Sequence, residues 1–168
     1  MRAPAPRRGA MMESSAFASE EAAQFWRYIA GSLDRLMALI AEQPASVLQF
    51  RPPAAQANSI LGLARHTLAN ARDNLLGVMQ GEPGGRDRQS EFEDLVPAEL
   101  LELWGGLRAE MEEALMALSA DVLAERVEHG RRGPIARREV LIVVARHAAE
   151  HLGQAELTRD LALAPDSA

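Results

Sequence analysis

The sequence contains no cysteine, and this absence removes several kinds of chemistry at once. The protein can have neither a disulfide framework nor a thiolate-bound zinc ion, and it has no thiol nucleophile of its own. Aromatic residues are also few, at 4% of the chain, although hydrophobic residues make up 48%. A core built mainly from Leu, Ala, Val, Ile and Met favours helices over strands. Only imidazole and oxygen ligands remain to hold a metal ion.

An excess of basic residues is absent as well, since 18 Lys and Arg residues stand against 24 Asp and Glu residues. The net charge of -6 disfavours nucleic-acid binding, which needs a basic face to neutralise phosphates. There is no run of 18 apolar residues that would predict a transmembrane helix. The first ten residues, rich in Arg, Pro and Ala, lack the apolar segment of a secretory signal. We therefore expect a cytoplasmic protein that contacts neither nucleic acid nor membrane.

The length of 168 residues suits a single domain. We expect residues 1–13 to form a disordered leader, residues 14–163 to form the domain and residues 164–168 to form a tail. Within the domain, apolar residues recur at three- and four-residue spacings in four segments. These predicted helices are 14–42, with an N-cap at Ser14 or Ser15, 58–80, with a cap at Asn58-Ser59, 97–119, with Pro97 in the first turn, and 136–163.

This pattern predicts an all-α four-helix bundle with long crossing connections and no strand. Residues 122–133, which mix charges with glycines, are expected to be one such connection. The residues of the third helix that we expect in the core are Leu100, Leu103, Trp104, Leu107, Met111, Leu115 and Leu118.

Three of the four histidines form the main candidate site. His147 and His151 are four residues apart on the predicted fourth helix, so they share a face and can converge on one ion. His66 lies on the second helix, beside its main apolar stripe and in line with Asn70 and Asp73, and an antiparallel bundle could bring it to the same place. Three protein ligands leave a coordination position open, which is typical of catalytic metals.

Each candidate also has a structural interpretation. The pair on the fourth helix could be buried neutral imidazoles that bond to neighbouring groups, and His66 could be a polar residue at the edge of the packing. His129 lies in a charged segment and is expected to be solvent-exposed. Asn70, Asp73 and Glu150 could orient a ligand or act as a base, although a solvated surface position is the ordinary expectation for such groups.

A basic cluster precedes the fourth helix. Its members are Arg131, Arg132, Arg137 and Arg138. Such clusters are usually solvated or paired with acids, but this one could also hold an anionic cosubstrate.

The sequence contains three pieces that belong together: Phe50-Arg51-Pro52 followed by Asn58-Ser59-Ile60, then Leu63-Ala64-Arg65-His66, and last His147-Ala148-Ala149-Glu150-His151-Leu152-Gly153-Gln154. These pieces resemble the DinB superfamily of bacterial four-helix bundles, which includes the thiol-transferase-like proteins of bacillithiol and mycothiol users. The resemblance extends from about residue 20 to residue 163. It implies that His66, His147 and His151 bind a divalent metal ion.

The resemblance and the missing cysteine together suggest a function. We expect a metal-dependent transferase or hydrolase in which Zn²⁺ or Ni²⁺ activates water or an external thiol, with a small-molecule substrate such as a low-molecular-weight thiol. The alternative is a non-enzymatic, stress-related protein that binds a metal or small ligand and whose ion is structural. In either case we expect a homodimer. No residue can be assigned a catalytic role from the sequence.

Overall fold

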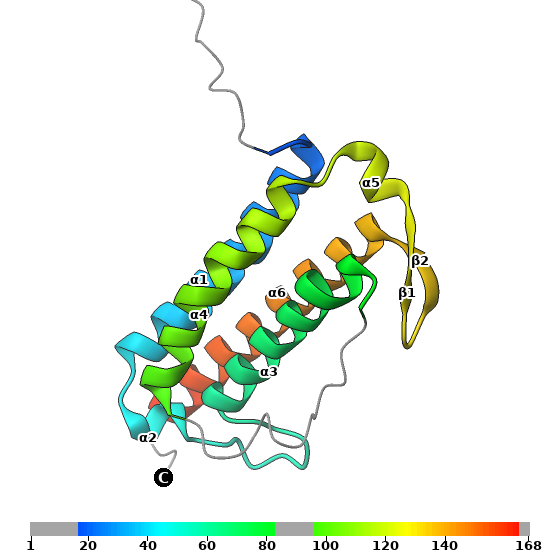
Figure 1. Ribbon diagram of the computed structural model, residues 1–168. Helices are drawn as coiled ribbons and strands as arrows, with labels where there is room; N and C mark the ends of the chain where they lie inside the picture. The colour runs from blue at the N-terminus through cyan, green and yellow to red at the C-terminus, as the bar shows by residue number, and fades with distance from the viewer. Residues whose placement is uncertain (1–16, 83–95, 165–168) are drawn as a thin grey trace, which may run out of the picture.

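The computed structural model describes residues 17–82 and 96–164 of the chain. Four long helices form the bundle: α1 (Glu20–Glu42), α3 (Ile60–Arg72), α4 (Pro97–Met116) and α6 (Arg137–Leu163). Figure 1 shows these helices side by side along one long axis. The shorter elements are α2 (Ala45–Leu48), the π-helical η1 (Asp73–Gly77), the 3₁₀ turn η2 (Val78–Gln80) and α5 (Ala120–Ala124). The fold class is therefore the predicted four-helix bundle, and the predicted leader lies outside the described residues.

Serine side chains fix where two of the long helices begin. The Oγ atom of Ser19 accepts a hydrogen bond from the backbone N–H of Ala22 at 3.1 Å, and Ser59 does the same for Gly62 at 3.2 Å. Each bond satisfies a backbone N–H that has no partner within the helix. The cap predicted at Ser59 is confirmed, whereas the cap predicted at residues 14–15 lies outside the described residues and Ser19 caps α1.

Ion pairs at two levels show that α1 and α6 run in the same direction. Arg138 lies 3.5 Å from Glu21 near the start of both helices, and Arg35 lies 2.5 Å from Glu156 further along both. The α4 helix runs the opposite way, because the N–H of residue 18 donates to the carbonyl of residue 116. The α3 helix also opposes α6. The helices α3 and α4 thus run in the same direction (Figure 1).

The segment predicted to be a strand-free connection contains a small β-hairpin, which corrects that prediction. Its strands are β1 (Arg126–His129) and β2 (Gly133–Ala136), and α5 precedes them. Val127 pairs with Ile135 across the hairpin and both are buried, so the hairpin covers the core with one apolar pair. Gly133 adopts a φ of 67°, which suits the residue that follows the turn. In strands of only four residues, the alternation of apolar and polar residues is too short to be recognised in the sequence.

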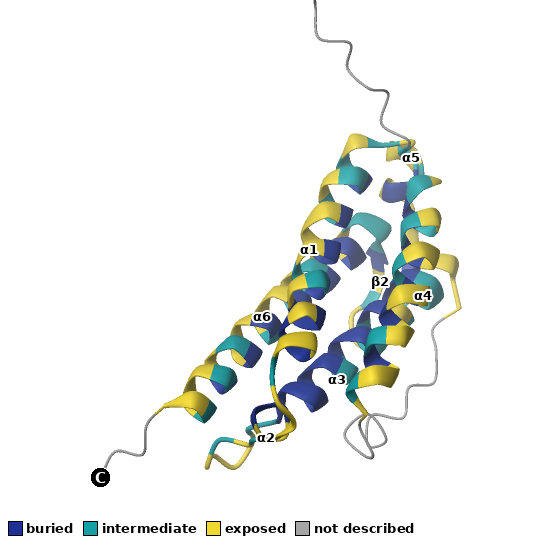
Figure 2. Ribbon diagram, turned by 90° about the vertical axis from the view of Figure 1, so that its left-hand side faces the viewer, coloured by how far each residue is buried: buried dark blue, intermediate teal, exposed yellow. Residues whose placement is uncertain are grey.

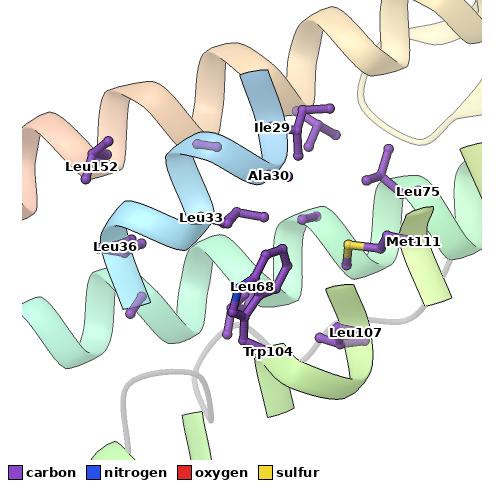
Figure 3. Packing of buried hydrophobic residues seen from close by; sticks show 14 of the residues in the cluster. Ile29, Ala30, Leu33, Leu36, Leu68, Leu75, Trp104, Leu107, Met111 and Leu152 are labelled. Carbon is purple, nitrogen blue, oxygen red and sulfur yellow. The ribbon is translucent and has the colours of Figure 1, made fainter. Parts of the chain in front are cut away.

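Aliphatic side chains from all four long helices fill the core. Figure 3 shows this packing around the residues Ile29, Leu33, Leu68, Leu75, Leu107 and Met111. Leu103 was expected in this core but is 39% exposed. Its neighbour Trp104 is buried as expected, because the core face of α4 is centred on residues 100, 104, 107, 111 and 115. Among the described residues, no helix is long and apolar enough to cross a membrane.

Candidate metal centre

The structure brings His66, His147 and His151 together at the contact between α3 and α6. The Nε2 atom of His147 lies 3.2 Å from the Nε2 atom of His66 and also 3.2 Å from that of His151. The ring centroids are 4.3 to 5.1 Å apart. All three side chains are half-buried, so the cluster lies between the core and the solvent.

Two features of the chain produce this convergence. The four-residue spacing places the two imidazoles of α6 on one face, next to the buried residues Ala148 and Leu152. The opposite direction of α3 then brings a residue from the middle of that helix to the same level. A hydrogen bond from Arg137 Nε to the carbonyl oxygen of Met79, at 2.9 Å, holds the same two segments together further along the contact.

Two of the three separations between the nitrogen atoms are close to those that one ion requires. An imidazole nitrogen binds Zn²⁺ at roughly 2.0–2.1 Å, so two such ligands in a tetrahedral shell are separated by roughly 3.3–3.4 Å. The observed separations of 3.2 Å are close to this value. The three residues form a group whose ligand atoms all lie within 4.8 Å of one another and could hold a metal ion.

Hydrogen bonding alone satisfies this arrangement poorly. A neutral imidazole nitrogen carries either one N–H or one lone pair. The Nε2 atom of His147 faces two other Nε2 atoms, so at most one of the two contacts can be a well-directed hydrogen bond. A cation at the centre would accept a lone pair from each of the three nitrogens at once, and the donor set therefore fits a divalent metal.

Gln154 fixes the orientation of one candidate ligand. The Nδ1 atom of His151 lies 2.7 Å from Gln154 Oε1. Because an amide oxygen only accepts, Nδ1 must carry the hydrogen, and Nε2 then presents its lone pair to the other imidazoles. Partners of this kind hold metal-bound histidines in place in many proteins. Sequence reasoning did not assign this role to Gln154, although its position three residues after His151 on one helix was the available signal.

The other candidates lie away from the cluster or beside it. Glu150 is exposed and pairs with Arg146 at 2.7 Å, in agreement with a solvated surface charge. Asn70 lies one turn beyond His66 on α3, and Asp73 is the first residue of η1. His129, which was expected to be exposed, is half-buried in β1 with a buried Nδ1 atom, because the hairpin folds it against the protein.

Two arginines of the basic cluster are held by the protein itself. Arg137 donates to the carbonyl oxygen of Met79 and pairs with Glu125, and Arg138 pairs with Glu21. The other two members, at positions 131 and 132, are exposed. These contacts favour the interpretation in which the cluster is paired with acids and solvated.

The comparisons with known proteins agree with the fold. The model of the DinB superfamily matches residues 28–155, a range that includes all three clustered histidines. A conserved protein from Enterococcus faecalis of known structure has a similar fold, with a TM-score of 0.71 at 15% identity over 87% of this chain and 99% of that one. No curated protein matches the sequence. The chain belongs to the DinB superfamily.

Proposed function

We propose that this protein is a metal-dependent transferase or hydrolase in which His66, His147 and His151 hold Zn²⁺ or Ni²⁺. The observation that carries the proposal is the meeting of three Nε2 atoms from two helices, with 81 sequence positions between His66 and His147. Both ions accept imidazole ligands. Three protein ligands leave room in the coordination shell for a further group, as in catalytic sites.

The chemistry of the site follows from its ligands and its exposure. A divalent ion, when bound, supplies Lewis acidity that lowers the pKa of a thiol or of water. The chain has no cysteine, so a thiol nucleophile has to come from a small molecule. The half-buried histidines leave the cluster accessible to such a molecule. Gln154 keeps the His151 ring in the tautomer that can coordinate.

A transfer assay tests this proposal. Metal-loaded protein is mixed with a reduced low-molecular-weight thiol and an electrophile, and with an activated ester for the hydrolase reaction. We expect the wild-type protein to accelerate one of these reactions and the His147→Ala variant to lose that acceleration. Equal rates for the two proteins in both assays would reject an enzymatic function.

The position of the cluster also supports a second function. An ion at the contact of α3 and α6 would connect two helices, and a structural ion would therefore stabilise the fold. This alternative is a stress-related binding protein without catalysis. Chelation separates the two functions. A structural ion should take much of the thermal stability with it, whereas loss of a catalytic ion should abolish turnover and lower the unfolding temperature by only a few degrees.

A homodimer is part of the proposal. Exposed apolar side chains on α1 and α6 support it, including Tyr28 at 71% and Leu157 at 60% exposure. Figure 2 shows the exposed outer faces of these helices. Light scattering of the protein as it elutes from a size-exclusion column should give twice the mass of one chain. A mass of one chain would reject the dimer.

A further inference from the structure

Two buried side-chain oxygens belong to asparagines that follow His66 in the sequence, one in α3 and one in η1. The Oδ1 atoms of Asn70 and Asn74 are buried and have no hydrogen-bond partner in the described part of the chain. Asn74 is only 4% exposed. Its Nδ2 atom donates to the carbonyl oxygen of Asn70 at 2.8 Å, which identifies its other terminal atom as the oxygen. Buried acceptors without a donor are rare because they lose their hydration without compensation.

The helical spacing between Asn70 and His66 relates the first of these oxygens to the candidate metal centre. Asn70 follows His66 by four residues, so it lies roughly 6 Å further along the helix axis and about 40° around it. Asn74 belongs to η1, where the chain changes from α-helical to π-helical winding. Such changes of winding occur frequently at functional sites. Asn70 thus lies one turn from His66 on a helix that packs against α6 (Figure 1), and Asn74 lies in η1, which follows that helix.

We propose that Asn70 and Asn74 form a subsite that accepts a hydrogen bond from the substrate. The inference rests on the proposed function, because it concerns the molecule that binds at the three histidines. The substrate class is a small thiol with an amide N–H, ammonium or hydroxyl donor about 6 Å from the position of the ion, which is one helical turn. Such a donor would complete an acceptor that the folded chain leaves without a partner.

Two thiols that differ in one atom test the subsite. N-acetylcysteamine carries an amide N–H where 2-mercaptoethyl acetate carries an ester oxygen, and the two molecules are otherwise alike. Binding of each thiol to Co²⁺-loaded protein can be followed through the sulfur-to-cobalt absorption band. We expect wild-type protein to bind the amide about tenfold more tightly, because the ester turns a second acceptor toward the asparagine oxygens. In the Asn70→Leu variant this preference should disappear.

Thr67→Val provides the matched control. Thr67 is a buried polar residue of the same helix, but its hydroxyl donates to the carbonyl oxygen of Leu63 at 2.6 Å. The Thr67→Val variant should keep the tenfold preference and unfold at a lower temperature than wild type. Asn74→Leu removes the acceptor that makes no bond but also the Nδ2 donor to the Asn70 carbonyl oxygen, so we expect it to abolish the preference for the amide and to lower the unfolding temperature less than Thr67→Val does.

The possible outcomes separate the subsite from the function. If both thiols bind equally well to wild type, or if Asn70→Leu keeps the preference, the subsite is overturned while the proposed function stands. If Asn74→Leu keeps the preference of the wild-type protein for the amide, Asn74 takes no part in binding and the two-asparagine subsite is overturned. If neither thiol changes the cobalt spectrum, thiol activation fails and the subsite proposal fails with it.

Discussion

The two helix contacts that contain polar clusters differ in the chemical groups that meet there. Between α1 and α4, Asp34 accepts hydrogen bonds from Trp104 Nε1 at 2.9 Å and from Arg108 Nε at 3.2 Å. The Arg108 guanidinium also lies over the ring of Trp26, 5.9 Å from its centroid. Between α3 and α6, three imidazole nitrogens face one another and one ring atom has two competing contacts.

This difference separates a structural cluster from a candidate site. The hydrogen bond with Asp34 raises the pKa of Arg108 above its ordinary value. The carboxylate therefore stabilises the charged guanidinium, and this pair needs no bound ligand. The histidine cluster is different, because its three Nε2 atoms converge and one cation could accept a lone pair from each of them. An ion pair with its hydrogen bonds stabilises the fold, whereas nitrogen atoms that converge at a metal-ligand spacing indicate a ligand.

Removing a candidate ligand should have the largest effect. We expect His147→Ala to weaken Zn²⁺ binding by more than about 100-fold, since residues that only orient a ligand already contribute about 10–100-fold. Isothermal titration calorimetry measures the affinity. His129→Ala is the matched control, because that histidine lies in β1, outside the cluster. A similar loss in both variants would contradict the account.

Removing the residue that orients His151 should have an intermediate effect. Gln154→Leu removes the acceptor for the Nδ1 hydrogen, and we expect Zn²⁺ affinity to fall about 10–100-fold. Gln154→Glu keeps an acceptor at the same position and should retain most of the affinity. The orienting role would be wrong if the leucine variant bound zinc as tightly as the glutamate variant.

Changing the cluster between α1 and α4 should affect stability alone. Asp34→Ala leaves the buried Trp104 N–H without its acceptor, and we expect a loss of about 1–2 kcal/mol in the free energy of unfolding. The Asp34 side chain is 44% exposed, so solvent limits the effect of losing the charge. Urea denaturation measures the loss. A parallel fall in zinc affinity would break the distinction between the two clusters.

The smallest effect is expected at an exposed ion pair. Arg35 pairs with Glu156 between α1 and α6, but its side chain is 68% exposed. Exposed pairs contribute between 0 and about 1 kcal/mol, so Arg35→Ala should change the free energy of unfolding by less than about 1 kcal/mol. Urea denaturation at low and high salt checks this value. A loss above 2 kcal/mol would show that the pair matters to the fold.

The sequence predicted the bundle well because its signals are local and long. Periodic apolar residues over 13 to 27 positions identified α1, α3, α4 and α6. The predicted starts at Ser59 and Pro97 were right, whereas α1 begins after Ser19 and not at residue 14 or 15. The hairpin was missed because each strand has only four residues. Leu103 was assigned to the core wrongly, since periodicity shows which face is apolar but not which residue at its edge is covered.

For the site, the sequence indicated the three histidines but not their surroundings. The spacing of His147 and His151 fixes their common face, whereas the position of His66 depends on the directions of the helices, which the sequence pattern left open. The hydrogen bond of Gln154 and the unpartnered oxygens of Asn70 and Asn74 depend on rotamers and burial. Such features arise from packing, and single-sequence patterns do not contain them.

The most direct test of the central claim is X-ray absorption at the zinc edge for protein loaded with one equivalent of Zn²⁺. The account predicts three imidazole nitrogens at roughly 2.0–2.1 Å and one further light ligand that a small thiol replaces. In His66→Ala the number of imidazole ligands should fall by one. A shell without imidazole in wild type, or a shell that the substitution leaves unchanged, would contradict the claim that the three histidines bind one ion.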